Sequence, residues 1–77
     1  MAIYKVRIKT EGNTTTYTTN ATTLATVTYH PTLDKWDVSA PSIGMLAETK
    51  EDADKTARES ITAFLASVGL TPDFINE

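Results

Sequence analysis

The stretch from Ala25 to Leu65 decides the fold of this chain, and it reads ATVTYHPTLDKWDVSAPSIGMLAETKEDADKTARESITAFL. In order, it predicts a strand, a turn, a second strand, a loop with Pro41 and Gly44, a short third strand and one amphipathic helix. The strands are expected over 24–30, 36–40 and 45–49. More than half of the protein is therefore one sheet-and-helix unit without an inserted loop.

The helix is predicted to begin after Thr49 and to end near Gly69. Thr49 suits the N-cap position, and Asp52 follows three residues later as a variant of the capping box. Apolar side chains recur at helical spacing on a single stripe made by Ala57, Ile61, Phe64, Leu65 and Val68. Gly69 suits a left-handed C-cap, so residues 70–77 are expected to form a short turn and a tail.

Residues 1–23 predict one clear strand and one ambiguous segment. Ile3–Thr10 alternates, with an apolar face and a basic face of Lys5, Arg7 and Lys9. Thr14–Thr23 is rich in threonine, which favours extended backbone, and is either a hairpin arm or a loop. The expected fold class is α+β, an antiparallel sheet of three to five strands with one amphipathic helix packed on one face.

Composition narrows the class of protein. Seventy-seven residues suit one domain, whose core rarely supplies more than about 3–5 kcal/mol of net stability. The chain has no cysteine and one histidine, which excludes disulfides and Cys/His zinc sites and leaves self-association as the usual aid at this size. A net charge of −3 and a pI near 5.0 disfavour a nucleic-acid-binding domain. With no signal peptide and no apolar run long enough for a membrane span, we expect a cytoplasmic protein.

The sequence contains no coherent catalytic set. His30 precedes Pro31, where it is expected to end a strand, and no cysteine or serine elbow accompanies it. Asp34 and Asp37 are expected to be solvated carboxylates rather than metal ligands. We therefore predict no enzyme activity, no cofactor and no metal site.

Short motifs resemble the HicB-like antitoxin domain. They are WDVSAPSIG over 36–44, Thr49, and ARESI over 57–61, within a matched core of 24–69. The resemblance implies a β-β-β-α module, a partial ribonuclease-H-like fold without its catalytic carboxylates. Members neutralise a small RNA-cleaving toxin by docking on it, usually as oligomers. Many also carry a C-terminal DNA-binding segment, which is not expected here because the sequence ends at Glu77.

The leading prediction is a non-catalytic protein-binding module that inhibits or sequesters a partner protein, with a basic ribonuclease toxin as a candidate. Glu48, Glu51, Asp52 and Asp54 form an acidic cluster around the helix start. The helix dipole accounts for it without a ligand, whereas the functional interpretation is a surface for a basic partner, with Glu48, Glu51 and Asp54 as contacts. Tyr17 lies among threonines with no apolar neighbours in sequence, so we expect it to be an exposed contact residue.

Two alternatives remain open from the sequence. One is a nucleic-acid-binding accessory protein that uses Lys5, Arg7 and Lys9, although no aromatic residues interleave with them. The other is a structural homo-oligomer that pairs through exposed sheet edges. The chain suits a cellular or a virus-encoded gene equally.

Overall fold

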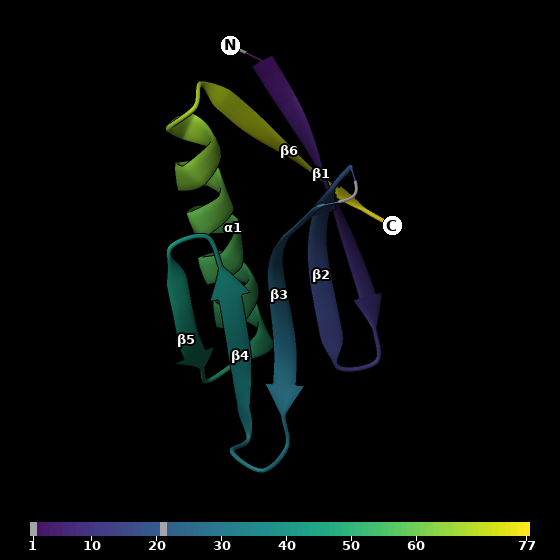
Figure 1. Ribbon diagram of the computed structural model, residues 1–77. Helices are drawn as coiled ribbons and strands as arrows, with labels where there is room; N and C mark the ends of the chain where they lie inside the picture. Colours follow the sequence, from purple (N-terminus) through teal and green to yellow (C-terminus); the bar gives the residue numbers. More distant parts are fainter. Residues whose placement is uncertain (1, 21) are drawn as a thin grey trace.

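Strands dominate the computed structural model, which describes residues 2–20 and 22–77. Its elements within those residues are β1 (Ala2–Glu11), β2 (Thr14–Thr19), β3 (Thr22–His30), β4 (Lys35–Ala40), β5 (Ile43–Ala47), α1 (Lys50–Ala66) and β6 (Leu70–Asn76). They form one twisted sheet in the order β5-β4-β3-β2-β1-β6 (Figure 1). The first five strands are an antiparallel meander, and β6 runs parallel to β1.

The predicted sheet class was wrong, because the described part of the chain has six strands and one parallel pair. Residues 70–77 contain Pro72 and Asp73, which are poor strand formers, so their local sequence indicated a turn and tail. However, α1 begins beside β5 and carries the chain back across the sheet to the outer side of β1. There β6 pairs with β1 along its length, which satisfies backbone groups that would otherwise need water.

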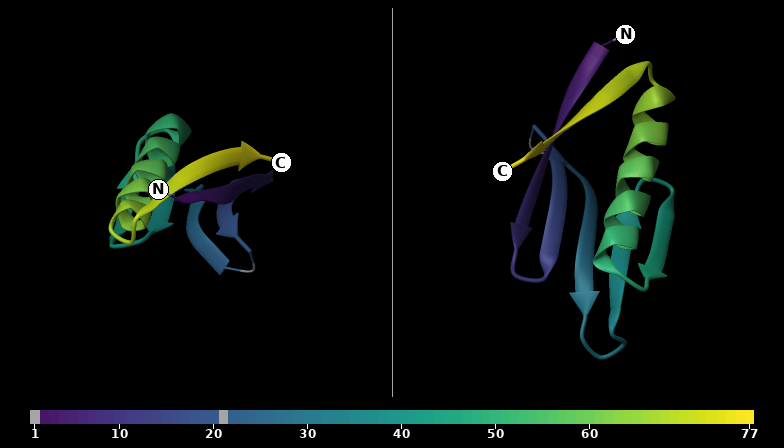
Figure 2. Two further views of the ribbon diagram at one scale, coloured as in Figure 1. Left: turned by 90° about the horizontal axis from the view of Figure 1, so that it is seen from above. Right: turned by 180° about the vertical axis from the view of Figure 1, so that it is seen from behind.

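One face of the sheet packs against α1, and the other face is uncovered (Figure 2). The helix contacts β3, β4, β5 and β6. Its buried residues are Ala53, Ala57, Ile61 and Leu65, and those beneath it include Val6, Val27 and Val38. The predicted stripe was wrong at Phe64 and Val68, which are 45% and 61% exposed. The buried stripe instead follows i, i+4 spacing, and its alanines let the helix approach the sheet closely.

The predicted N-cap of α1 is confirmed, but its C-cap is Ser67, in the right-handed helical region, rather than Gly69. Thr49 is the N-cap, and its hydroxyl oxygen accepts a hydrogen bond from the backbone N–H of Asp52 at 3.1 Å. Gly69 adopts the left-handed conformation at φ +78°, which glycine reaches without steric cost. This residue turns the chain from α1 into β6.

The loop between β4 and β5 is shorter than expected. It consists of Pro41 and Ser42, and Ser42 has a φ of +64°. A proline followed by a residue at positive φ is typical of a type II turn. The chain therefore resumes pairing at Ile43, and the third strand of the central unit spans Ile43–Ala47 rather than 45–49.

Within the threonine-rich segment, Thr14–Thr19 form a hairpin arm and Thr22 and Thr23 begin β3, whereas residue 21 lies outside the described residues. β2 pairs with β1 on one side and with β3 on the other, so it lies inside the sheet. Thr15, Tyr17 and Thr19 are buried, whereas Thr14, Thr16 and Thr18 point to the uncovered face and are only partly buried. The Thr15 and Thr10 hydroxyl oxygens lie 3.1 Å apart and share a hydrogen bond. Threonine is β-branched and therefore favours a strand, and the buried Thr15 hydroxyl has a hydrogen-bond partner.

Candidate functional site

Exposed apolar residues gather on β5, an edge strand of the sheet. Among the described residues β5 pairs only with β4, so its outer backbone groups face solvent. Ile43, Met45 and Leu46 are all at least partly exposed, and Leu46 reaches 49%. The strand, IGMLA, contains no charged residue and no proline. Natural sheets usually protect an edge with lysine, proline or a covering element, and β5 has none of these in its own sequence.

Both faces of β5 carry apolar side chains. Ile43, Met45 and Ala47 pair with the β4 residues that face α1, so they lie on the helix side. Leu46 pairs with the exposed Asp37 and lies on the uncovered face. A partner strand added to this edge would therefore meet apolar side chains above and below its backbone.

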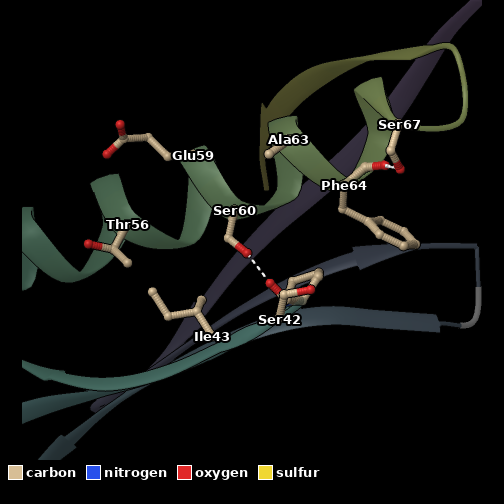
Figure 3. A pocket seen from close by; sticks show the side chains of 9 residues that line it. Ser42, Ile43, Thr56, Glu59, Ser60, Ala63, Phe64 and Ser67 are labelled. Atoms are coloured by element: carbon tan, nitrogen blue, oxygen red, sulfur yellow. Dashed lines mark hydrogen bonds between the residues drawn. The ribbon is translucent and has the colours of Figure 1, made fainter.

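A groove opens beside β5, between the β4–β5 turn and the C-terminal half of α1 (Figure 3). Its volume is about 560 Å³, and its apolar lining comes from Pro41, Ile43, Ala63 and Phe64. The Ser60 hydroxyl donates a hydrogen bond to the Pro41 carbonyl oxygen and ties the turn to the helix. This bond explains how a two-residue turn keeps one wall of the groove in place.

The predicted acidic residues divide into two groups. Glu48 and Glu51 are exposed, and the Glu48 carboxylate contacts the Lys35 ammonium group on β4. Glu48 shares a surface with Met45 and Leu46, so it forms an acidic rim next to the apolar edge. Asp54 lines a surface hollow with Glu51, but its side chain is only 21% exposed.

Asp54 is partly exposed and also takes part in hydrogen bonds within the chain. Its Oδ1 accepts a hydrogen bond from the Tyr17 hydroxyl at 2.9 Å, and its Oδ2 accepts one from Lys50 Nζ at 2.7 Å. Arg58 also lies near the Tyr17 hydroxyl, and its guanidinium carbon is 5.4 Å from the centre of the Phe74 ring. These contacts engage the Asp54 carboxylate within the chain itself.

The expected exposure of Tyr17 was wrong, because its side chain is fully buried. Every second residue of β2 faces α1, and Tyr17 has this position between Thr15 and Thr19. Its ring packs edge-on against Phe74 with centroids 6.2 Å apart. Burial raises the pKa of Tyr17 to about 12. The prediction failed because the apolar neighbours of Tyr17 come from other elements of the chain.

The basic stripe lies on the uncovered face as expected, but acidic neighbours reduce its charge. Lys9 forms an ion pair with Glu11 at 2.9 Å, which raises the pKa of Lys9 and lowers that of Glu11. Asp73 on β6 is the direct cross-strand neighbour of Lys5. Paired charges of this kind weaken phosphate binding, so the nucleic-acid alternative gains no support.

The other polar residues that the sequence singled out are exposed or hydrogen-bonded within the chain. His30 and Asp37 are exposed, and Asp34 accepts a hydrogen bond from the Tyr29 hydroxyl at 2.6 Å. Within residues 2–20 and 22–77, no three His, Asp or Glu side chains come together in a way that would hold a metal ion. In the same part of the chain, no helix has the length and apolar character that crossing a membrane requires.

The fold and the surface define an α+β protein with an unprotected apolar sheet edge beside an acidic rim. Comparison of the chain with protein-family models, curated proteins and solved structures finds no match. The HicB-like resemblance therefore still rests on the short motifs alone. The sequence signal for the edge was the uncharged run 43–47, placed last in a strand meander.

Proposed function

We propose that the protein is a non-catalytic protein-binding module that inhibits or sequesters a partner protein. The observation that carries the proposal is the β5 edge, defined as residues 43–47, with its solvent-facing backbone and its exposed Ile43, Met45 and Leu46. Such an edge accepts an extended strand from a partner, because main-chain hydrogen bonds provide affinity and alternate side chains provide specificity. The apolar groove beside Phe64 offers room for a further side chain of that partner.

Charge indicates the chemistry of the partner. Glu48 borders the β5 edge, and Glu51 and Asp52 follow on the first turn of α1. A partner with basic side chains flanking its strand would complement this rim. The HicB-like resemblance implies a small basic ribonuclease, and we propose this class as the first candidate. The proposal places the protein in the cytoplasm, where such a partner would act on RNA.

A charge placed on the β5 edge should block the partner. Leu46→Lys introduces a lysine opposite Asp37, and this pair of opposite charges is compatible with the isolated sheet. When a partner strand is added at the edge, however, the lysine charge would be buried, which is unfavourable. We expect the affinity for the partner to fall by at least about tenfold, equivalent to ~1.4 kcal/mol. Tagged protein would be used to capture the partner from native lysate, mass spectrometry would identify it, and calorimetry with the purified partner would give the affinity.

Leu33→Lys is the matched control, since Leu33 is 50% exposed in the β3–β4 turn and lies outside the edge. A stoichiometric basic ribonuclease that is retained by the wild type and by Leu33→Lys, but lost with Leu46→Lys, supports the proposal. Equal retention by both variants would exclude the β5 edge. Recovery of no protein other than the chain itself would remove the inhibitor function.

The acidic rim gives a separate prediction. Replacing Glu48 and Glu51 together with lysine should weaken binding of a basic partner and make the remaining affinity less sensitive to salt. Helical circular dichroism should not change, because both side chains are exposed. The control carries the same charge change at the opposite edge of the sheet, with Asp73→Lys on β6 and Glu77→Lys directly after it. Unchanged affinity in the rim variant would contradict the role of the acidic rim.

A further inference from the structure

Gly44 is not required by the fold of a single chain. Its φ is not in the left-handed region, and a Cβ atom added to it would meet nothing closer than the Val38 carbonyl oxygen at 4.0 Å. Glycine weakens a strand, and in this setting it often marks the close approach of another chain or a ligand. Gly44 is the second of the five residues of the β5 edge, so its presence indicates something beyond the monomer.

The β5 edge is complementary to itself. When it is aligned antiparallel with a second copy so that Met45 faces its own counterpart, Gly44 faces Leu46 of the second copy. In the same alignment Ile43 faces Ala47 of the second copy. Each large side chain other than Met45 thus faces a small one, and the exposed Leu46 covers a glycine.

The backbone favours the same register. A two-residue loop closes the β4–β5 hairpin, so the adjoining Ala40–Ile43 pair exchanges hydrogen bonds across the hairpin. Because such pairs alternate, Met45 also bonds inward to β4, and Gly44 and Leu46 direct their N–H and C=O groups outward. In the alignment centred on Met45, the outward N–H and C=O groups of one copy lie opposite the outward N–H and C=O groups of the other, so they can form hydrogen bonds. A shift of one residue would place them opposite residues whose N–H and C=O groups point toward β4.

Charges and topology allow this contact to close on itself. The surface beside β5 carries Glu48, Asp52, Lys55 and Glu59, and Glu48 is paired with Lys35, so basic side chains offset part of the acidic charge that a two-fold axis brings together. The opposite edge strand, β6, contains Pro72 and Asp73, which protect it from pairing. Isologous pairing at β5 therefore gives a closed dimer rather than a growing sheet.

We infer that, without its protein partner, the β5 edge is covered by a second copy of this chain, paired antiparallel about a two-fold axis at Met45. This inference rests on the proposed function, since the partner strand and the second copy occupy the same edge. Partner binding then displaces the second copy, and the dimer is the resting form that keeps the apolar edge out of water. A partner that binds the same edge must compete with this dimer.

Single-cysteine cross-linking tests the pairing, because the chain has no native cysteine. Met45→Cys places two thiols at a directly opposed pair whose Cα atoms are about 4.5 Å apart, within the range that a disulfide requires. Leu46→Cys places them diagonally, about 7–8 Å apart, which is too far. Under mild aerobic oxidation, with oxygen accepting the electrons of the two thiols, Met45→Cys should form the covalent dimer at least about tenfold faster. Leu33→Cys gives the rate of random collision.

Light scattering of the uncrosslinked protein over a wide dilution range completes the test. We expect a dimer for the wild type and for Leu33→Lys, and a shift toward monomer for Leu46→Lys. Faster cross-linking of Leu46→Cys than of Met45→Cys would overturn the register. A wild-type monomer at every concentration would overturn the inference, whereas the proposed function would still be judged by partner capture. A dimer sensitive to Leu46→Lys without any captured partner would support the inference and remove the proposed function.

Discussion

Tyr17→Ala is expected to leave most of the protein unfolded at room temperature. Tyr17 is among the largest fully buried side chains, and it packs between β1, β3 and Phe74. Truncating a buried aromatic residue to alanine costs about 3–5 kcal/mol, and a core of this size supplies about 3–5 kcal/mol in total. Urea unfolding followed by circular dichroism measures the effect. A midpoint equal to that of the wild type would show that Tyr17 is not in the core.

Tyr17→Phe separates packing from hydrogen bonding. It keeps the ring but removes the bond to the Asp54 carboxylate, and bonds to charged groups contribute about 1.5–3 kcal/mol. We expect the free energy of unfolding to fall by an amount near the lower end of that range, because Asp54 keeps its contact with Lys50. A loss as large as that of Tyr17→Ala would mean that the hydroxyl, rather than the ring, holds this part of the core.

The free energy of unfolding at alkaline pH should also depend on Tyr17. The pKa of Tyr17 is raised to about 12 in the folded protein, against an ordinary value of 10.0. As pH rises, the unfolded chain loses this proton first, so the contribution of Tyr17 is complete below pH 10 and is lost between pH 10 and 12. The stability difference between wild type and Tyr17→Phe should therefore shrink over that interval. A constant difference would contradict the buried, neutral hydroxyl.

Ending the chain after Gly69 is the second change with a large expected effect. It removes β6, which pairs with β1 from Ala2↔Leu70 to Ile8↔Asn76 and packs Leu70 and Phe74 against the core. The truncation exposes one side of β1, uncovers Val6 and removes the ring that packs on Tyr17. We expect the cooperative unfolding transition, measured by thermal circular dichroism, to be lost. The free energy of the missing contacts should exceed the net stability of a protein with so small a core.

Phe74→Ala is the matched control for the truncation. It keeps the backbone pairing of β6 and removes only the half-buried ring and its contacts with Tyr17 and Arg58. We expect a folded protein that is less stable by about 2 kcal/mol, below the range for a fully buried aromatic residue. A truncated chain that unfolds at the wild-type temperature would contradict the pairing of β6 with β1.

Local sequence patterns predicted structural features correctly where those features depend on residues close together in the chain. The alternation at Val6 and Ile8, the Thr49 cap and the left-handed Gly69 are each set by contacts within a few residues, and the structure confirms them. The strands expected over 24–30 and 36–40 are also present, within β3 and β4, where the Tyr29 and Trp36 rings lie side by side with centres 5.0 Å apart. These features follow from steric preference and periodicity.

The candidate site was only partly predictable. Glu48 and Glu51 lie on the surface as the sequence indicated, because charged side chains at a helix start rarely bury. Tyr17 is buried and Asp54 is only partly exposed, since each is the other's hydrogen-bond partner across 37 residues of sequence. The apolar edge at Ile43, Met45 and Leu46 was missed because the uncharged run 43–47 indicates only an apolar strand, whereas an edge is defined by what lies beside that strand.

The sequence by itself determined the size, the acidic charge, the absence of cysteine chemistry, and most of the helix and strand positions. Those properties depend on composition or on residues close together along the chain. Only the tertiary structure decided that 70–76 is a strand, that Tyr17 is core and that β5 is an open edge. Each of these depends on pairing between distant segments, where long-range backbone bonds and burial outweigh weak local preference.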